Sequence, residues 1–173
     1  NNYCFTTTAL TSQIWLIYEK DNEWHTESVG TIGDPAKIPL PVDISITADD
    51  KHLWVNTWND GMTRVFDISD PHNAKEVYTH KIGDQVNMLS QSWDGKRVYY
   101  TSSLLANWDK ADGPEKMPQF FKAYHYKDGK LEFQWSLDFA KEKLGMPHQM
   151  RFGAYSLYSK SPKGGAKVAE LSK

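Results

Sequence analysis

The fold is decided by the stretch Ile44-Ser45-Ile46-Thr47-Ala48-Asp49-Asp50-Lys51-His52-Leu53-Trp54-Val55-Asn56, which returns as Leu89-Ser90-Gln91-Ser92-Trp93-Asp94-Gly95-Lys96-Arg97-Val98-Tyr99-Tyr100-Thr101. Each copy has an apolar alternating run, a Ser or Thr, and a two-residue acidic or glycine turn. A Lys and a second run rich in aromatic and β-branched residues then follow. This order is typical of a β-hairpin. The offset of 45 positions between the copies is typical of β-propeller blades.

Further short strands are predicted on both sides of the repeated hairpin. A third strand after the first copy and a short outer strand would complete four strands in about 45 residues, which is one blade. Upstream, two runs are interpreted as the inner hairpin of the preceding blade, and downstream two more form another hairpin. The third strand is Met62–Ile68 and the outer strand is Lys75–Thr79. The upstream runs are Cys4–Ala9 and Gln13–Tyr18, and the downstream runs are Phe120–Tyr126 and Leu131–Leu137. The sequence therefore predicts an all-β chain of three to four propeller blades; the alternative is a small open sheet or sandwich.

The length of the chain predicts an incomplete ring. At about 45 residues per blade, 173 residues give fewer than four blades, whereas closed propellers have about four to eight. Because an open arc exposes strand edges and blade faces, we expect an N-terminal portion of the same gene product, or a complementary chain, to complete the ring. The same edges would permit a homo-oligomer. We expect a partial propeller over residues 1–158 and a polar, lysine-rich mobile tail over residues 159–173.

Composition excludes several classes of function. A net charge of -2 with 39% hydrophobic and 13% aromatic residues describes a soluble globular domain. Lys and Arg are scattered among acidic residues, which argues against binding to nucleic acid. No run of about 18 apolar residues occurs, so no membrane span is predicted.

Two segments interrupt the strand pattern. Residues 102–118 form a long insertion after the second copy, and insertions of this length tend to carry function. Residues 138–145 are predicted to form a helical turn or two, with Gly145 as the stop signal. This turn leads into Met146-Pro147-His148-Gln149-Met150-Arg151-Phe152, a segment outside the repeat.

The chain resembles the selenium-binding protein and methanethiol oxidase family, in collinear order from about Tyr3 to Phe152. The stretch that carries the resemblance runs from Ser92 to Leu104 and continues as Ala106-Asn107-Trp108-Asp109-Lys110. Members of the family have a near-identical Ser-x-Asp-Gly-Lys-Arg-aliphatic-Tyr-x-Thr-x-Ser-Leu-x-x-x-Trp-Asp-Lys stretch. The other matching positions are Asp43–Asp50, Trp58, Gly61, Arg64, Asp67–Pro71, Asp138-Phe139 and His148–Phe152.

The resemblance implies that the chain is the C-terminal portion of a seven-bladed propeller. It implies a copper-dependent oxidase that converts methanethiol, dioxygen and water to formaldehyde, hydrogen sulfide and hydrogen peroxide. Bacterial members are often exported, so we expect a periplasmic location, with the cytoplasm as the alternative. The family's Cys- and His-bearing N-terminal motifs lie outside this chain. The chain departs from the family tail at Gln149, where relatives have Glu, and at Gly153-Ala154-Tyr155, where they have Pro-Gly-Gly.

Two histidines are the candidate copper ligands. Copper favours imidazole and sulfur, and the chain has six His, one Cys and five Met, with no compact ligand spacing. His148 follows a Pro in a non-repeating loop and occupies a position where the family has His. His125 alternates with Tyr124 and Tyr126 in a predicted strand and could face the channel. The alternatives are a loop histidine bonded to a main-chain carbonyl for His148 and a non-ligand role for His125.

Two other residues are candidates for the surroundings of the metal. Asp43 precedes the inner run Ile44-Ser45-Ile46, where a carboxylate could orient a ligand histidine. An ordinary strand-end Asp is the alternative. Trp108 lies in the insertion beside Asp109 and Lys110 and could wall the substrate entrance, although aromatic residues more often fill cores. No catalytic residue is assigned.

Two other classes of function remain open, because propellers host many functions. One is a noncatalytic scaffold that binds a protein, or a thiol or selenium ligand. The other is a calcium-dependent, lactonase-like hydrolase, for which Asp43, Asn56 and Asn87 could supply oxygen ligands. Elemental analysis separates them, because copper supports the oxidase, calcium the hydrolase and no metal the scaffold.

Overall fold

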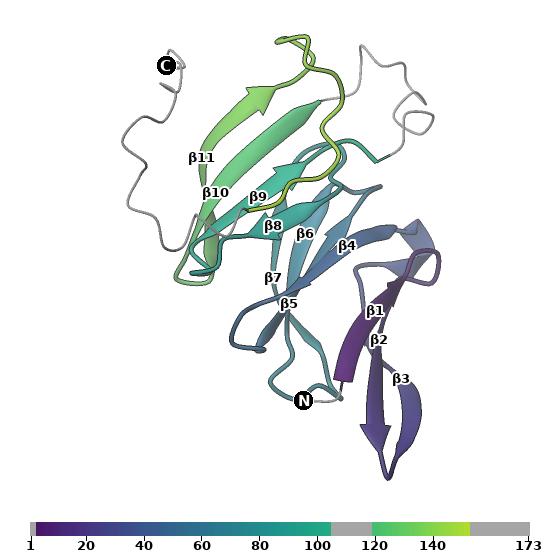
Figure 1. Ribbon diagram of the computed structural model, residues 1–173. Coiled ribbons are helices and arrows are strands. Elements are labelled where there is room, and N and C mark those ends of the chain that lie inside the picture. The colour runs from purple at the N-terminus through teal and green to yellow at the C-terminus, as the bar shows by residue number, and fades with distance from the viewer. Residues whose placement is uncertain (1–2, 105–118, 153–173) are drawn as a thin grey trace.

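The chain folds into three antiparallel sheets that follow one another in sequence order (Figure 1). The computed structural model describes residues 3–104 and 119–152. The first sheet contains β1 (Tyr3–Thr8), β2 (Gln13–Lys20) and β3 (Glu23–Thr31). The second contains β4 (Pro41–Ile46), β5 (His52–Thr57), β6 (Met62–Asp67) and β7 (Lys75–Lys81), and the third β8 (Leu89–Gln91), β9 (Arg97–Thr101), β10 (Phe120–Lys127) and β11 (Lys130–Asp138). A short 3-10 helix, η1 (Pro35–Lys37), precedes β4. The prediction of an all-β chain is confirmed.

The repeated sequence forms the same hairpin twice. In the first copy the hydroxyl of Thr47 donates to Asp49 Oδ1 at 2.6 Å and accepts the N–H of His52 at 3.0 Å. In the second copy the hydroxyl of Ser92 donates to Asp94 Oδ1 at 2.5 Å and accepts the N–H of Arg97 at 3.0 Å. Asp50 and Gly95, at equivalent positions, both have positive φ angles, of 56° and 67°. The two predicted hairpins are therefore confirmed, and equivalent side-chain hydrogen bonds close both turns.

A second repeated contact identifies equivalent strands in the three sheets. In each sheet, the residue directly after the outermost strand donates its N–H to the carbonyl of the residue directly before the neighbouring strand. The three bonds are Ile32 N to Ser12 O at 2.8 Å, Ile82 N to Gly61 O at 2.9 Å and Phe139 N to Gln119 O at 2.7 Å. β1 thus corresponds to β5 and β9, the second strands of their sheets.

This correspondence corrects the interpretation of the first two predicted strands as an inner hairpin. β1 and β2 are the equivalents of a second and a third strand, and β3 is the outermost strand. The sequence did not decide this, because inner and outer hairpins share the same alternation of apolar and polar residues. Among the described strands, the first sheet has no counterpart of β4 and β8.

Both faces of the middle sheet are buried. Leu53 and Val55 of β5 pack with Phe5, Ile14 and other residues of the first sheet. Trp54, between them in sequence, points the opposite way because side chains alternate along a strand. It packs with residues of the third sheet that include Val98, Tyr100, Tyr124 and Leu131. Stacking of sheets through alternate faces is the packing expected of consecutive propeller blades.

Residues 138–145 form hydrogen-bonded turns where a helical turn or two was predicted. Glu142 N bonds to Asp138 O at 3.0 Å, as in one helical turn, but Leu144 N then bonds to Phe139 O at 2.9 Å. Lys143 and Gly145 have positive φ angles, of 55° and 91°, which prevent a helix from continuing. Within the described residues, no helix is long and apolar enough to cross a membrane.

Candidate functional site at the inner strands

The innermost strands β4 and β8 lie side by side and are joined by two side-chain links. The carboxylate of Asp43 accepts the N–H of Leu89 at 2.8 Å. Two residues further along each strand, Gln91 Nε2 donates to Ser45 Oγ at 2.8 Å. The links repeat every second residue because these side chains leave their strands on the same side. They fix the spacing of two adjacent blades along the line where the inner strands meet.

A cavity of about 280 Å³ lies along these inner strands. Its apolar lining includes Ile44, Ile46, Leu89 and Trp93, and the segment after His148 contributes Arg151 and Phe152. Residues of two blades and of the C-terminal segment therefore meet at one hollow. We take this hollow and the polar groups beside it as the candidate functional site.

His148 is held at the end of β9 by main-chain and side-chain contacts. Ser103 N donates to Pro147 O at 3.0 Å, and Thr101 Oγ1 donates to His148 O at 2.6 Å. The ring nitrogen Nδ1 of His148 lies 3.1 Å from Ser103 O and 3.0 Å from Asn87 Nδ2. The histidine is exposed, but its backbone and one of its two ring nitrogens are fixed by this third sheet.

Asp43 has an altered acidity for reasons that the structure makes clear. Burial raises the pKa of its carboxyl, while the N–H groups of Leu89 and Ile44 and the charge of Arg151 act in the opposite direction. The side chain links two strands, and its carboxylate accepts the main-chain N–H groups of Ile44 and Leu89. The proposed role of Asp43 in orienting a ligand histidine therefore stays a prediction, whereas its role in linking β4 to β8 is seen in the structure.

The structure does not bring His125 to His148. β9 pairs with β10 so that Phe121 is opposite Thr101, whereas His125 is opposite Arg97 at the other end of β9. β10 is the third strand from the inside of its sheet, so the expectation that His125 could face the channel is corrected. Alternation in the sequence cannot distinguish an inner strand from a third strand. Trp108 lies outside the described residues.

The described residues offer one imidazole, that of His148, to a metal ion such as copper. Within residues 3–104 and 119–152, no three His, Cys, Asp or Glu side chains group closely enough to hold a metal ion. His148 could supply one imidazole ligand through Nε2, because its Nδ1 faces a main-chain carbonyl, the common arrangement for a ligand histidine. Further ligands would have to come from outside the described residues.

Asn56 and Asn87 do not support the alternative of a calcium-dependent hydrolase. Asn56 Nδ2 donates to Asn87 O at 2.7 Å, and Asn87 Nδ2 donates to Ser103 O. The Oδ1 atoms of both are buried and, among the described residues, without a hydrogen-bond partner. Neither asparagine is among the residues that line the cavity of about 280 Å³.

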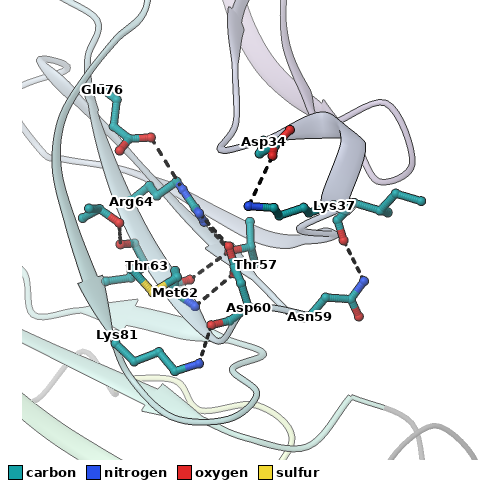
Figure 2. Close-up of polar contacts among 12 residues, drawn as sticks. Asp34, Lys37, Thr57, Asn59, Asp60, Met62, Thr63, Arg64, Glu76 and Lys81 are labelled. Atoms are coloured by element: carbon teal, nitrogen blue, oxygen red, sulfur yellow. Dashed lines mark hydrogen bonds and ion pairs between the residues drawn. The ribbon is translucent and has the colours of Figure 1, made fainter.

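A second polar cluster surrounds Arg64 of the second sheet, beside the loop before β4 (Figure 2). The buried guanidinium bonds to Thr57 Oγ1 at 2.5 Å and to Asp60 Oδ2 at 2.6 Å, and Nε lies 3.5 Å from Glu76. A Cβ on Gly33 would lie 2.8 Å from Arg64 Nη2, so the loop before β4 packs directly on this group. Because the described partners compensate the buried charge, the cluster is structural.

Sequence reasoning missed the contact between Asn87 and His148. Asn87 precedes β8 and His148 lies 61 residues later, so no local spacing connects them. Asn87 was considered as an oxygen ligand, whereas its amide nitrogen makes the contacts. Only the packing of the C-terminal segment against the third sheet reveals this.

Radial sheets with linked inner strands define part of a β-propeller, and solved structures agree. A hypothetical selenium-binding protein from Sulfolobus tokodaii is similar with a TM-score of 0.68 and 28% identity, over 79% of this chain and 38% of that one. The periplasmic gluconolactonase PpgL of Pseudomonas aeruginosa has a TM-score of 0.66 at 15% identity, over 88% of this chain and 40% of that one, and supports the fold alone. The prediction of a partial propeller is confirmed.

The chain belongs to the 56 kDa selenium-binding protein family, whose model matches residues 1–159. The methanethiol oxidase of Ruegeria pomeroyi is 57% identical over 159 residues, which are 91% of this chain and 36% of that protein. The chain thus spans about a third of the length of this relative. The family resemblance read from the sequence is confirmed.

Proposed function

We propose that the full-length protein containing this chain is a copper-dependent methanethiol oxidase. It would convert methanethiol, dioxygen and water to formaldehyde, hydrogen sulfide and hydrogen peroxide. The observation that carries the proposal is the 57% identity to a protein named methanethiol oxidase, over a match that covers nearly all of this chain. The activity would belong to the whole protein, because the chain covers 36% of that relative.

In this proposal the chain supplies one metal ligand and part of a small substrate cavity. His148 would bind copper through Nε2, while Ser103 and Thr101 hold its loop. Bound copper would supply redox chemistry and increase the acidity of a thiol. The cavity of about 280 Å³ along β4 and β8, which Trp93 and Phe152 help to line, would accept the methyl group of methanethiol.

We further propose that the remaining blades come from the N-terminal portion of the protein, with association between copies as an additional possibility to test. A periplasmic location is proposed from the resemblance to exported bacterial members. Fractionation of cells that produce the full-length protein tests the location. Recovery of the protein only in the cytoplasm would overturn it.

Metal analysis and substitution test the function. In the purified full-length protein we expect bound copper and oxygen-dependent formation of hydrogen peroxide from methanethiol. His148→Ala should reduce turnover at least 100-fold and lower the copper content. His125→Ala removes an exposed histidine from the third strand of the same sheet and should change neither.

Three outcomes would contradict the proposal. A folded, copper-free protein with full turnover would exclude copper as the cofactor. A folded protein that holds no metal and gives no turnover would favour the noncatalytic scaffold. Calcium in place of copper, together with hydrolysis of a lactone, would favour the hydrolase.

A further inference from the structure

We infer that Asn87 is a positioning residue that fixes the Ser103 carbonyl, which orients the His148 ring so that Nε2 is available to a metal ion. The inference rests on the proposed copper-dependent function and assigns a role that the sequence did not indicate. Its basis is the meeting of Asn87, Ser103 and His148, which come from the strand connection before β8, the end of β9 and the C-terminal segment.

Asn87 is itself rigidly placed. Its side chain is fully buried, and its N–H donates to Thr101 O at 2.8 Å. Its carbonyl accepts Asn56 Nδ2 at 2.7 Å, which ties it to β5 of the preceding blade. An amide fixed in this way can hold a flexible partner in place at low entropic cost.

The ring of His148 has a partner for Nδ1 in either neutral tautomer. When Nδ1 carries the proton, it donates to Ser103 O at 3.1 Å, and Nε2 has the lone pair that a metal ion needs. When Nδ1 lacks the proton, it can accept from Asn87 Nδ2 at 3.0 Å. In that tautomer Nε2 carries the proton, so the Asn87 contact holds the ring before a metal ion binds, and the Ser103 carbonyl holds it once the proton lies on Nδ1 and a metal ion takes Nε2.

Asn87 also holds the carbonyl that selects the metal-binding tautomer. Asn87 Nδ2 donates to Ser103 O, the same oxygen that accepts from His148 Nδ1. A carbonyl oxygen has two lone pairs and can accept both bonds. Loss of the amide would release the Ser103 carbonyl on one side and the imidazole on the other.

A neighbouring residue provides a matched control. Gln85 lies two positions before Asn87, is similarly buried, and donates from Nε2 to Ser102 O at 2.8 Å. It makes the same kind of bond, to the carbonyl of the adjacent peptide. Gln85→Ala therefore removes strand anchoring, whereas Asn87→Ala removes anchoring and the contact with the histidine.

The experiment compares these variants in the full-length protein. Copper dissociation constants are measured by competition with a chelator, and the Cu(II) environment by electron paramagnetic resonance. We expect Asn87→Ala to weaken copper binding roughly 10–100-fold and to alter the spectrum, as removal of outer partners of ligand histidines does. Gln85→Ala should lower the melting temperature by a similar amount, with an unchanged spectrum and affinity. Asn87→Ser, which is too short to reach either partner, should act as Asn87→Ala does and serves if that variant fails to fold.

His148→Ala separates the failure of this inference from that of the proposed function. If His148→Ala abolishes copper binding while Asn87→Ala and Asn87→Ser behave as Gln85→Ala does, the positioning role is wrong and the copper site stands. If the wild-type protein binds no copper, or His148→Ala leaves the affinity unchanged, the proposed site fails and this inference fails with it.

Discussion

At the scale of single residues, Asp49 and Asp94 organise the two copies of the repeated hairpin. The hydroxyl of Ser92 and the N–H of Lys96 donate to Asp94 and lower the pKa of its carboxyl. The hydroxyl of Thr47 has the corresponding effect on the pKa of Asp49. A lowered pKa stabilises the fold above the pKa of the unfolded chain, and that contribution is lost as pH falls through the folded-state pKa.

Replacement of Ser92 by Ala tests this arrangement. The variant should lose about 0.5–1.5 kcal/mol of stability at pH 7, because Asp94 loses its hydroxyl donor and Arg97 its acceptor. The difference from wild type should shrink when the pH is lowered through the pKa of Asp94. Thermal unfolding of the full-length protein at pH 7 and at a pH below the Asp94 pKa measures it. Equal differences at the two pH values would contradict the proposed role of the carboxylate.

At the scale of elements, the turns and connections of the blades differ in how closely they are packed. Gly61 ends the turn before β6 with φ of 60°, and a Cβ there would lie 2.0 Å from Gly83 O. The connection after β7 crosses directly over this turn, since Ile82 N bonds to Gly61 O. Gly129, in the β10–β11 turn, also has a positive φ, of 75°, but a Cβ there would meet nothing within 4 Å.

The two glycines predict different costs for the same substitution. Gly129→Ala should cost about 1 kcal/mol, which is the strain of a left-handed backbone. Gly61→Ala adds a clash with main chain, so it should cost well over 3 kcal/mol or prevent folding. Soluble yield and the melting temperature of the two full-length variants measure the difference. Equal effects would show that the connection after β7 moves aside easily.

At the scale of the whole molecule, one face of the third sheet has no other sheet of the described residues (3–104 and 119–152) against it. Tyr99, Phe121 and Trp135 lie side by side across the third sheet, and Phe152 contacts Tyr99 edge-on with ring centroids 5.0 Å apart. Trp135 is 46% exposed. The equivalent space between the second and third sheets is filled by Trp54, Tyr100 and their neighbours. We therefore expect another blade of the full-length protein to cover this aromatic face.

Replacement of Trp135 tests the expected blade contact. If another blade covers the aromatic face, Trp135→Ala should destabilise the full-length protein by about 3 kcal/mol, as the loss of a buried aromatic does. Trp24→Ala is the matched control, because Trp24 is 66% exposed on the outermost strand β3. Melting temperatures of both variants give the comparison. A small and equal effect of the two substitutions would contradict the expected contact.

The sequence by itself determined the strands whose pattern is local. The repeated turns around Asp49 and Asp94 and the alternation of β5 depend on neighbours a few residues away, so they are readable without coordinates. β3 was not recognised, because an outermost strand exposes most of its side chains and Val29 is its one buried residue. The family followed from the stretch Ser92–Leu104, whose residues are contiguous.

The tertiary structure alone decided which strands are innermost and which polar groups meet. The place of β1 follows from the bond between Ile32 and Ser12, and the separation of His125 from the C-terminal segment follows from the pairing of β9 with β10. The partnership of Asn87 with His148 joins residues 61 positions apart. Such contacts arise from the packing of sheets against each other, which local periodicity does not encode.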